Sequence, residues 1–305
     1  MKYVLAVDGG GTKTHVLCAD ETGQVIGEGY AGPTNMTAIT PGAASFNLRE
    51  GVRQATEKLE PGFVIQNMVM GLAGADSVEE EQNARQVFLQ VLQDYTIENL
   101  TLVNDTVIAL ANGSEATDAL ILVAGTGSNC FGHNSEGKTA KAGGMDYILA
   151  DQGSGYSIGR AVLRKAVKSF DGRGPHTELE QFVCEHFKIS SIAELKPKVH
   201  NPLLTKTEIA ELAQVCLRAF DQGDATAKDI FDHNLDELYT MATAVINRLG
   251  LKDKKVDLVL AGSITKIAYI QNNLTKRLQE YCPALNVIVP TTAPVHGALK
   301  MALKK

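Results

Sequence analysis

The stretch from Asp8 to Thr14 constrains the fold of this chain most, because it places three consecutive glycines between two short apolar runs. Glycine permits close approach of the backbone, so the N–H groups of such a turn can surround an anion. Hydroxyl and ammonium groups in the same turn add further donors. The candidate phosphate-binding residues are Gly9, Gly10, Gly11, Thr12, Lys13 and Thr14. Taken alone, the stretch could also form a tight hairpin without a ligand.

The order of residues in this turn separates it from other nucleotide-binding loops. Thr12 precedes Lys13 and an apolar run follows, whereas a Walker A loop requires Gly-Lys-Ser/Thr before a helix. Asp8 ends the preceding strand, where a carboxylate can hold a hydrated Mg²⁺ near a bound phosphate. Residues 27–32 match G-x-G-x-x-G, but Pro33 follows where a dinucleotide-binding turn requires a helix. We therefore expect no dinucleotide site there.

Two further glycine turns end later apolar runs. The run 119–124 is followed by a second candidate backbone and hydroxyl cradle, made of Gly125, Thr126, Gly127 and Ser128. The run 256–261 is followed by a turn of small residues against which an adenine or ribose could lie, made of Ala261, Gly262 and Ser263. In this order the three turns resemble the two phosphate motifs and the adenosine motif of the actin, sugar kinase and chaperone ATPase superfamily.

Short apolar runs alternate with helical patterns along the chain, which is typical of α/β proteins. The expected strands are residues 3–8, 15–20, 25–30, 64–71, 100–103, 119–124 and 256–261, and a short strand-like stretch through Phe131 follows the second glycine turn. The expected helices are residues 43–58, 78–93, 154–169, 177–187, 207–221 and 225–249. Because a strand, glycine turn and strand occur twice, we expect a duplicated topology. We predict two α/β domains, residues 1–115 and 116–293, with a ligand cleft between them and a helical insertion at 154–250.

The composition argues against several classes of protein. With 29 Lys and Arg against 35 Asp and Glu, the net charge is −6, without the basic excess that nucleic-acid binding requires. Five dispersed cysteines without a C-x-x-C pair fit a reducing cytoplasm and not a zinc ribbon. No apolar run approaches the roughly 20 residues that cross a bilayer, and the first residues do not form a signal-peptide pattern. We therefore expect a cytoplasmic protein without nucleic-acid or membrane partners.

Carboxylates near expected strand ends are candidates for chemistry. Asp105 ends a strand after Asn104, where α/β sheets bind ligands, and could accept the proton of a phosphoryl acceptor hydroxyl. Asp151 lies in a glycine turn before a helix, and an N-cap is the alternative role for both acids. Residues 143–146 and Asn35 offer polar groups to a sugar, although ordinary turns explain them equally well.

Other sequence signals carry little chemistry. The seven histidines show no paired ligand spacing, and no G-x-S-x-G motif supports a serine hydrolase. Cys130 follows the second cradle, and we expect it to be a small buried residue.

Taken together, these motifs resemble the BadF/BadG/BcrA/BcrD-type ATPase family and, within it, the N-acetylglucosamine kinases. The resemblance covers nearly the whole chain in order. It rests on Asp8–Thr14, Gly71–Gly74, Asn104–Asp105, Gly125–Cys130, Asp151–Ser154, Ala261–Ser263 and Pro294–Leu299. It implies two actin-like, ribonuclease H-like domains, with the C-terminal helix 294–305 packed back on the N-terminal domain. It also implies a homodimer.

The resemblance implies a role for each matching residue. Thr12 and Thr126 would contact the ATP phosphates, Asp8 would hold Mg²⁺ through water, and Asp105 would activate the 6-hydroxyl of N-acetylglucosamine. The adenosine would be bordered by Ala261, Gly262 and Thr265. The amino sugar would be lined by Asn35, Gly74, Asp105, Gly144, Met145, Asp146 and Asp151.

The chain departs from the family on the sugar side. Met145-Asp146 replaces Trp-Gly of the mammalian enzyme, and Gln152 replaces Glu. Glucosamine and N-acetylmuramic acid therefore stay open as substrates. An activator ATPase of a 2-hydroxyacyl-CoA dehydratase is a further alternative, but no cysteine here lies in a cluster-bridging motif. A sugar-responsive repressor would carry a DNA-binding extension and a Cys-rich zinc motif; we expect no such extension, because an apolar strand begins at Tyr3.

Overall fold

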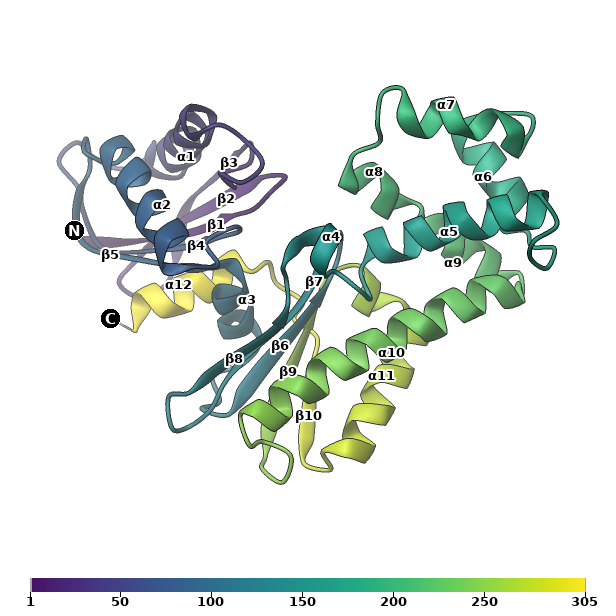
Figure 1. Cartoon of the computed structure of the whole chain (residues 1–305). Coiled ribbons are helices and arrows are strands. Elements are labelled where there is room, and N and C mark those ends of the chain that lie inside the picture. Colours follow the sequence, from purple (N-terminus) through teal and green to yellow (C-terminus); the bar gives the residue numbers. More distant parts are fainter. Residues whose placement is uncertain (1, 305) are drawn as a thin grey trace. The chain divides into compact units, whose positions relative to one another are not determined.

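The computed structural model describes residues 2–304, which form two compact units. The N-terminal unit comprises Met1–Glu115 and Val289–Lys305, and the C-terminal unit comprises Ala116–Ile288 (Figure 1). Each unit is built around one five-stranded mixed sheet. The predicted α/β class is therefore confirmed.

The two sheets have the same topology. In the N-terminal unit the strand order is β3-β2-β1-β4-β5, and in the C-terminal unit it is β8-β7-β6-β9-β10. The first three strands of each sheet pair antiparallel, and the last two join in parallel. The strands are β1 (Lys2–Gly9), β2 (Thr14–Asp20), β3 (Val25–Ala31), β4 (Val64–Leu72), β5 (Thr96–Asn104), β6 (Ala119–Ala124), β7 (Ser128–His133), β8 (Thr139–Gly143), β9 (Val256–Ala261) and β10 (Leu285–Ile288). The expected duplication of topology is present.

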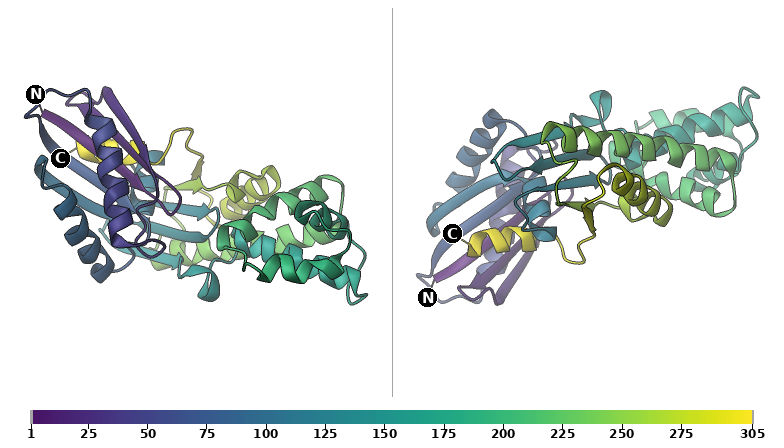
Figure 2. Two further views of the ribbon diagram at one scale, coloured as in Figure 1. Left: turned by 90° about the horizontal axis from the view of Figure 1, so that it is seen from above. Right: turned by 90° about the horizontal axis from the view of Figure 1, so that it is seen from below.

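The central strand β1 is buried on both faces, as its continuous apolar run requires. Leu5 and Val7 point into a core covered by α1 (Pro41–Thr56) and α2 (Val78–Val91). Val4 and Ala6 point into a second core covered by α3 (Asp105–Gly113) and α12 (Val295–Leu303). This alternation follows from the two-residue period of a strand. Figure 2 shows α1 and the yellow α12 on opposite faces of this sheet.

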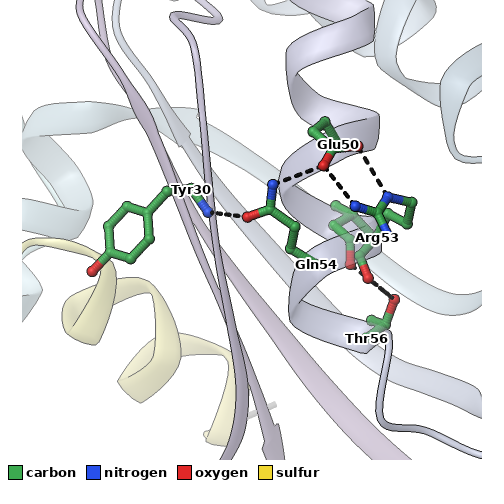
Figure 3. A network of polar contacts seen from close by, with 6 residues as sticks. Tyr30, Glu50, Arg53, Gln54 and Thr56 are labelled. Atoms are coloured by element: carbon green, nitrogen blue, oxygen red, sulfur yellow. Dashed lines mark hydrogen bonds and ion pairs between the residues drawn. The ribbon is translucent and has the colours of Figure 1, made fainter.

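Strand β3 lies at the edge of its sheet and packs closely against α1. A Cβ atom on Gly27 would lie 2.0 Å from the Ala55 carbonyl oxygen, and one on Gly29 would lie 2.0 Å from that of Gly51. The G-x-G pattern at this strand therefore serves helix packing. The edge N–H of Tyr30 donates to the Gln54 side chain at 3.0 Å, which satisfies a group that an edge strand otherwise exposes (Figure 3).

In the C-terminal unit a helical insertion separates β8 from β9. Its helices are α4 (Asp146–Leu149), α5 (Gly155–Phe170), α6 (Leu179–Phe187), η1 (Ile192–Glu194), α7 (Leu195–His200), α8 (Lys206–Glu211), α9 (Ala213–Asp221) and α10 (Ala225–Arg248). The long α10 packs on β6, β7 and β8, as Figure 1 shows. After β9 come η2 (Ile264–Lys266) and α11 (Ala268–Tyr281), and α11 packs on α10 and β10.

The structure differs from the expected elements in a few places. The single helix expected at 207–221 is two helices, because Leu212 ends α8 before α9 begins. Strand β5 begins at Thr96, four residues before the expected start at Leu100, because its polar edge residues Glu98 and Asn99 carry no apolar signal. The elements that sequence reasoning did not list are α3, α4, α7, α11, β8 and β10.

Candidate functional site

The first glycine turn joins β1 to β2 as a hairpin. The Gly10 N–H donates to the Lys13 carbonyl at 3.0 Å, and the buried Thr14 hydroxyl donates to the Gly32 carbonyl at 2.8 Å. A Cβ atom on Gly9 would lie 2.3 Å from the Thr34 hydroxyl oxygen, so this position requires glycine. Gly11, Thr12 and Lys13 are exposed at the tip of the turn, which leaves their donors accessible to an anion.

Two carboxylates lie beside this hairpin. The pKa of Asp8 is raised to about 6, mainly by burial and then by the negative charge of Asp105, against the opposing charge of Lys13. Asp105 is the first residue of α3, and its helix is capped by Asn104, whose side chain accepts the Thr106 N–H at 2.9 Å. The N-cap alternative for Asp105 is therefore wrong. Its carboxylate lies at the positive end of a helix, next to a second carboxylate.

Asn35 and Gly74 meet at the same end of the sheet. Asn35 holds its own turn, because its side-chain oxygen accepts from the Thr37 N–H at 2.9 Å and from the Thr37 hydroxyl at 2.7 Å. A Cβ atom on Gly74, where φ is +79°, would lie 2.4 Å from that side-chain oxygen. The Asn35 amide nitrogen lies 3.8 Å from the Cβ position of Gly11. The N-terminal unit thus brings the hairpin, Asn35 and Gly74 together.

The second glycine turn joins β6 to β7. The Gly125 N–H donates to the Gly127 carbonyl at 2.9 Å. The Gly125 carbonyl accepts the Gly155 N–H at 2.7 Å, and the Thr126 carbonyl accepts the Tyr156 N–H at 3.3 Å. Because Gly155 and Tyr156 begin α5, this helix is attached directly to the second turn.

Asp151 lies beneath the second turn. It is 4% exposed and has a positive φ of 68°, a conformation that non-glycine residues seldom adopt. Its carboxylate accepts the Ser128 N–H at 3.0 Å. The N-cap of α5 is Ser154, which accepts the Ser157 N–H at 3.2 Å. The capping alternative for Asp151 is therefore wrong, and its strained backbone holds a buried carboxylate against the turn.

Sequence reasoning missed Lys206, which links two of the predicted sugar residues. Its ammonium lies 2.6 Å from the Asp146 carboxylate and 2.7 Å from that of Asp151. Burial lowers the pKa of Lys206, but hydrogen bonds and charge from both acids outweigh it and raise that pKa above its ordinary value. Lys206 begins α8, far along the chain from both acids, so no local motif could have identified it. Its ammonium compensates the buried charge of Asp151.

The other predicted sugar residues of this unit lie close by. The Gly144 N–H donates to the Ser128 carbonyl at 3.0 Å, which attaches the loop to the second turn. Met145 is 67% exposed, and Asp146 is the exposed partner of Lys206.

The third glycine turn contacts the second. Gly262 has a φ of +94°, and a Cβ atom there would lie 2.2 Å from the Ala124 carbonyl oxygen. The Thr265 hydroxyl, which is 1% exposed, donates to the Gly262 carbonyl at 3.0 Å. Ala261 ends β9, and Ser263 is exposed on the turn. The C-terminal unit therefore brings both of its glycine turns together.

The described residues contain no ready-made metal cage. Within residues 2–304 no three His, Cys, Asp or Glu side chains cluster as metal ligands. The pair Asp8 and Asp105 nevertheless fits Mg²⁺, because hard carboxylate oxygens with unfavourable mutual charge are stabilised by a divalent cation. Cys130 is fully buried, and burial raises its thiol pKa above the ordinary range. Among the described helices none is long and apolar enough to span a membrane.

Comparison with known sequences gives consistent matches over the full chain. The profile of the BadF/BadG/BcrA/BcrD ATPase family matches residues 5–302. An N-acetylmuramic acid/N-acetylglucosamine kinase from Clostridium acetobutylicum is 34% identical over 304 residues, which cover 99% of this chain and 98% of that protein. An N-acetyl-D-glucosamine kinase from Dictyostelium discoideum is 27% identical, with 98% and 97% of the two chains covered.

Comparison with solved structures supports the fold. An N-acetylglucosamine kinase candidate from Chromobacterium violaceum superposes with a TM-score of 0.74 at 22% identity, covering 99% of both chains. A ROK family glucokinase from Streptomyces griseus, solved with glucose and AMPPNP, gives a TM-score of 0.59 at 16% identity, covering 99% of this chain and 100% of that one. The two-sheet architecture therefore matches the fold of these two structures.

Proposed function

This chain belongs to the BadF/BadG/BcrA/BcrD ATPase family, and we propose that it transfers the γ-phosphate of ATP to the 6-hydroxyl of N-acetylglucosamine or a close relative. It is a sugar kinase, since its full-length relatives are amino-sugar kinases. The observation that carries the finer proposal is the pairing of Asp105 and Asp8 beside a glycine hairpin whose tip is exposed. Asp105 can accept the proton of the sugar hydroxyl, and Asp8 can hold the metal ion.

In the proposed reaction Asp105 accepts the proton of the sugar 6-hydroxyl as its oxygen attacks the γ-phosphorus. Phosphoryl transfer needs mainly alignment and stabilisation of charge, so one positioned carboxylate suffices as base. Asn35, next to Gly74, has amide donors and an acceptor suited to orienting sugar hydroxyls. We assign Gly144, Met145, Asp146 and Asp151 to the same amino sugar.

The nucleotide is assigned to the glycine turns. Gly9 to Thr14 and Gly125 to Ser128 would donate backbone and hydroxyl hydrogen bonds to the phosphates, and the positive end of α5 lies at the second turn. Ala261, Gly262, Ser263 and Thr265 would border the adenosine. Asp8 would hold Mg²⁺ through water, and the ion when bound neutralises phosphate charge.

The identity of the amino sugar is the finer part of the proposal. The relative from Clostridium acetobutylicum is named for both N-acetylmuramic acid and N-acetylglucosamine, and a glucosamine kinase from Vibrio cholerae is 30% identical over 61% of this chain. The local charge favours an uncharged sugar over one with a carboxylate, because Asp146, Asp151 and Lys206 together carry a net charge of −1. We therefore place N-acetylglucosamine ahead of N-acetylmuramic acid, with glucosamine as the alternative.

The activator ATPase is the second candidate and has weaker support. An iron–sulfur cluster is held by deprotonated Cys thiolates. In the described chain Cys18, Cys130, Cys216 and Cys282 are buried, and burial raises the pKa of each of these thiols. The family resemblance also supports a homodimer in the cytoplasm, which sedimentation and cell fractionation test directly.

A coupled ADP-release assay with Mg-ATP tests the proposal. The acceptors are N-acetylglucosamine, glucosamine, N-acetylmuramic acid, glucose and no sugar, with 6-deoxy-N-acetylglucosamine as the control that lacks the attacking hydroxyl. We expect turnover with N-acetylglucosamine and only background hydrolysis with the 6-deoxy sugar. ATP hydrolysis that is indifferent to every sugar would overturn the kinase and favour the activator.

A further inference from the structure

A pocket of about 830 Å³ lies within the C-terminal unit, among α5, η1, α7 and α10. All of its lining residues belong to this unit, and none belongs to the glycine turns. Its volume is in the range of about 300–1,000 Å³ that holds small molecules. The amino-sugar kinase proposal does not use this pocket.

Six cationic side chains line the pocket together with apolar residues: Arg160, Arg164, Lys165, Lys168, Arg173 and Lys196. Helix α5 contributes Arg160, Arg164 and Lys168 at intervals of four residues, together with Lys165, while α7 contributes Lys196. The one acidic residue in the lining, Asp171, already forms a two-point ion pair with Arg173. Within residues 2–304, Arg164, Lys168 and Lys196 form no ion pair with a carboxylate. The pocket therefore carries excess positive charge in a chain whose net charge is −6.

This arrangement disfavours folding. Like charges four residues apart on a helix destabilise it by about 0.2–0.5 kcal/mol per pair. A local arrangement that works against stability is characteristic of a functional site. A bound anion would relieve the repulsion along α5.

The floor of the pocket is apolar. Ile192 is 5% exposed and Leu195 is 4% exposed, and both line the pocket together with Val167 and Val199. An inorganic ion would leave this surface uncovered, whereas an organic anion would cover it while its charged groups meet the basic rim. The volume of about 830 Å³ also favours a small molecule over a flat macromolecular surface.

Two direct contacts connect the pocket to the glycine turns. Helix α5 lines the pocket along its middle turns, and its first residues donate to the Gly125 and Thr126 carbonyls. Asn234 also lines the pocket, and its buried side chain accepts the Gly153 N–H at 3.2 Å beside Asp151. A shift of α5 or Asn234 therefore moves atoms that hold the second turn and Asp151.

We propose that this pocket binds a small organic anion carrying two or more phosphate or carboxylate groups, and that its occupancy alters turnover at the glycine turns. The binding part stands independently, whereas the effect on turnover rests on the proposed kinase function.

Isothermal titration calorimetry tests the binding. Fructose 1,6-bisphosphate and citrate are the probes, and saturating Mg-ADP with N-acetylglucosamine keeps the nucleotide and sugar sites occupied. The pocket variant is Arg164→Glu with Lys168→Glu, and the control is Lys138→Glu with Lys255→Glu, which makes the same charge change at exposed positions of the same unit. We expect saturable binding by wild type and control, and at least tenfold weaker binding by the pocket variant. Absence of saturable binding by both probes, or equal binding by all three proteins, overturns the pocket.

Two further measurements complete the test. Thermal melting checks folding. We expect the pocket variant to melt close to wild type, because both positions are exposed, the repulsion between two glutamates replaces that between Arg164 and Lys168, and a glutamate at position 164 attracts Arg160. In the kinase assay the bound probe should change kcat or the KM for ATP in wild type and control, but not in the pocket variant. If the probe binds to wild type but leaves its kinase rate unchanged, then the proposed coupling between the pocket and the glycine turns is overturned. If the protein binds the probe but phosphorylates no sugar, then the result supports anion binding in the pocket and contradicts the proposed kinase function.

Discussion

The two glycine hairpins occupy the same topological position but have different neighbours. In the N-terminal unit the strand before the hairpin ends in Asp8, and the charge of Asp105 acts on that carboxylate. In the C-terminal unit the corresponding strand ends in Ala124, and the buried acid beside the turn, Asp151, shares the Lys206 ammonium with Asp146. The duplicated topology has therefore diverged in charge. The N-terminal hairpin lies beside two carboxylates whose charges repel each other, an arrangement suited to chemistry, whereas the C-terminal hairpin lies beside acids that share one ammonium in a hydrogen-bonded environment suited to binding.

The largest predicted effect falls on the carboxylate side of this comparison. Asp105→Asn removes the proposed base while keeping the size of the side chain, so kcat should fall by about 10²–10⁴. The Kd for ATP, measured by calorimetry, should stay within a few-fold, because the glycine turns are unchanged. Near wild-type turnover of Asp105→Asn would show that Asp105 is not the base. Loss of ATP binding would instead indicate a folding defect.

The second prediction concerns Asp8 and the dependence of stability on pH in metal-free protein. Its pKa is raised from 3.8 to about 6 on folding, so the folded state binds the proton more tightly than the unfolded state. The associated stability is complete below pH 3.8 and is lost as the pH rises through 6; it amounts to at most about 3 kcal/mol. Asp8→Asn should therefore unfold with a flatter pH dependence between pH 4 and 7.

Urea unfolding in EDTA at a series of pH values measures this difference. Asp20→Asn is the matched control, because Asp20 lies at the other end of the same β-hairpin and hydrogen bonds lower its pKa. In that variant the free energy of unfolding should still rise as the pH falls from 7 to 4, as it does in wild type. Equal slopes for wild type and Asp8→Asn would show that the charge of Asp8 is compensated in the folded protein.

Local sequence patterns predicted the strands and glycine turns of both units better than the contacts that the tertiary fold makes around them. Short apolar runs and glycine turns are local signals, so β1, β2, β6 and β9 and all three turns could be read directly. The N-cap role could not be assigned correctly, because Asn104 and Ser154 compete with neighbouring acids for the same cap geometry. Lys206 could not be found, because its partnership with Asp151 is made by the tertiary fold of the helical insertion. Elements without a strong apolar period, such as α11, were missed for a related reason.

The third prediction tests the C-terminal side of the comparison, where Asp146 and Asp151 share Lys206. Lys206→Met keeps the aliphatic stem but leaves the 4%-exposed Asp151 without its cation. The KM for the amino sugar should rise about tenfold with a smaller change in kcat, because Asp151 and Asp146 lose their common partner. Lys206→Arg keeps the charge and should retain most of the affinity. Equal kinetics in Lys206→Met and wild type would place Asp146 and Asp151 outside the sugar site.

The smallest predicted effect compares two helix caps. Ser154 caps α5, whose first residues hold the second glycine turn, whereas Ser77 caps α2, which packs on α1 and β5. Replacing either serine by alanine should cost about 0.5–2 kcal/mol in unfolding free energy. Only Ser154→Ala should also raise the KM for ATP, by a few-fold, because fraying of α5 releases the Gly125 and Thr126 carbonyls. If both variants lose stability and neither changes the KM for ATP, then the attachment of α5 stabilises the fold of the C-terminal unit and does not contribute to nucleotide binding.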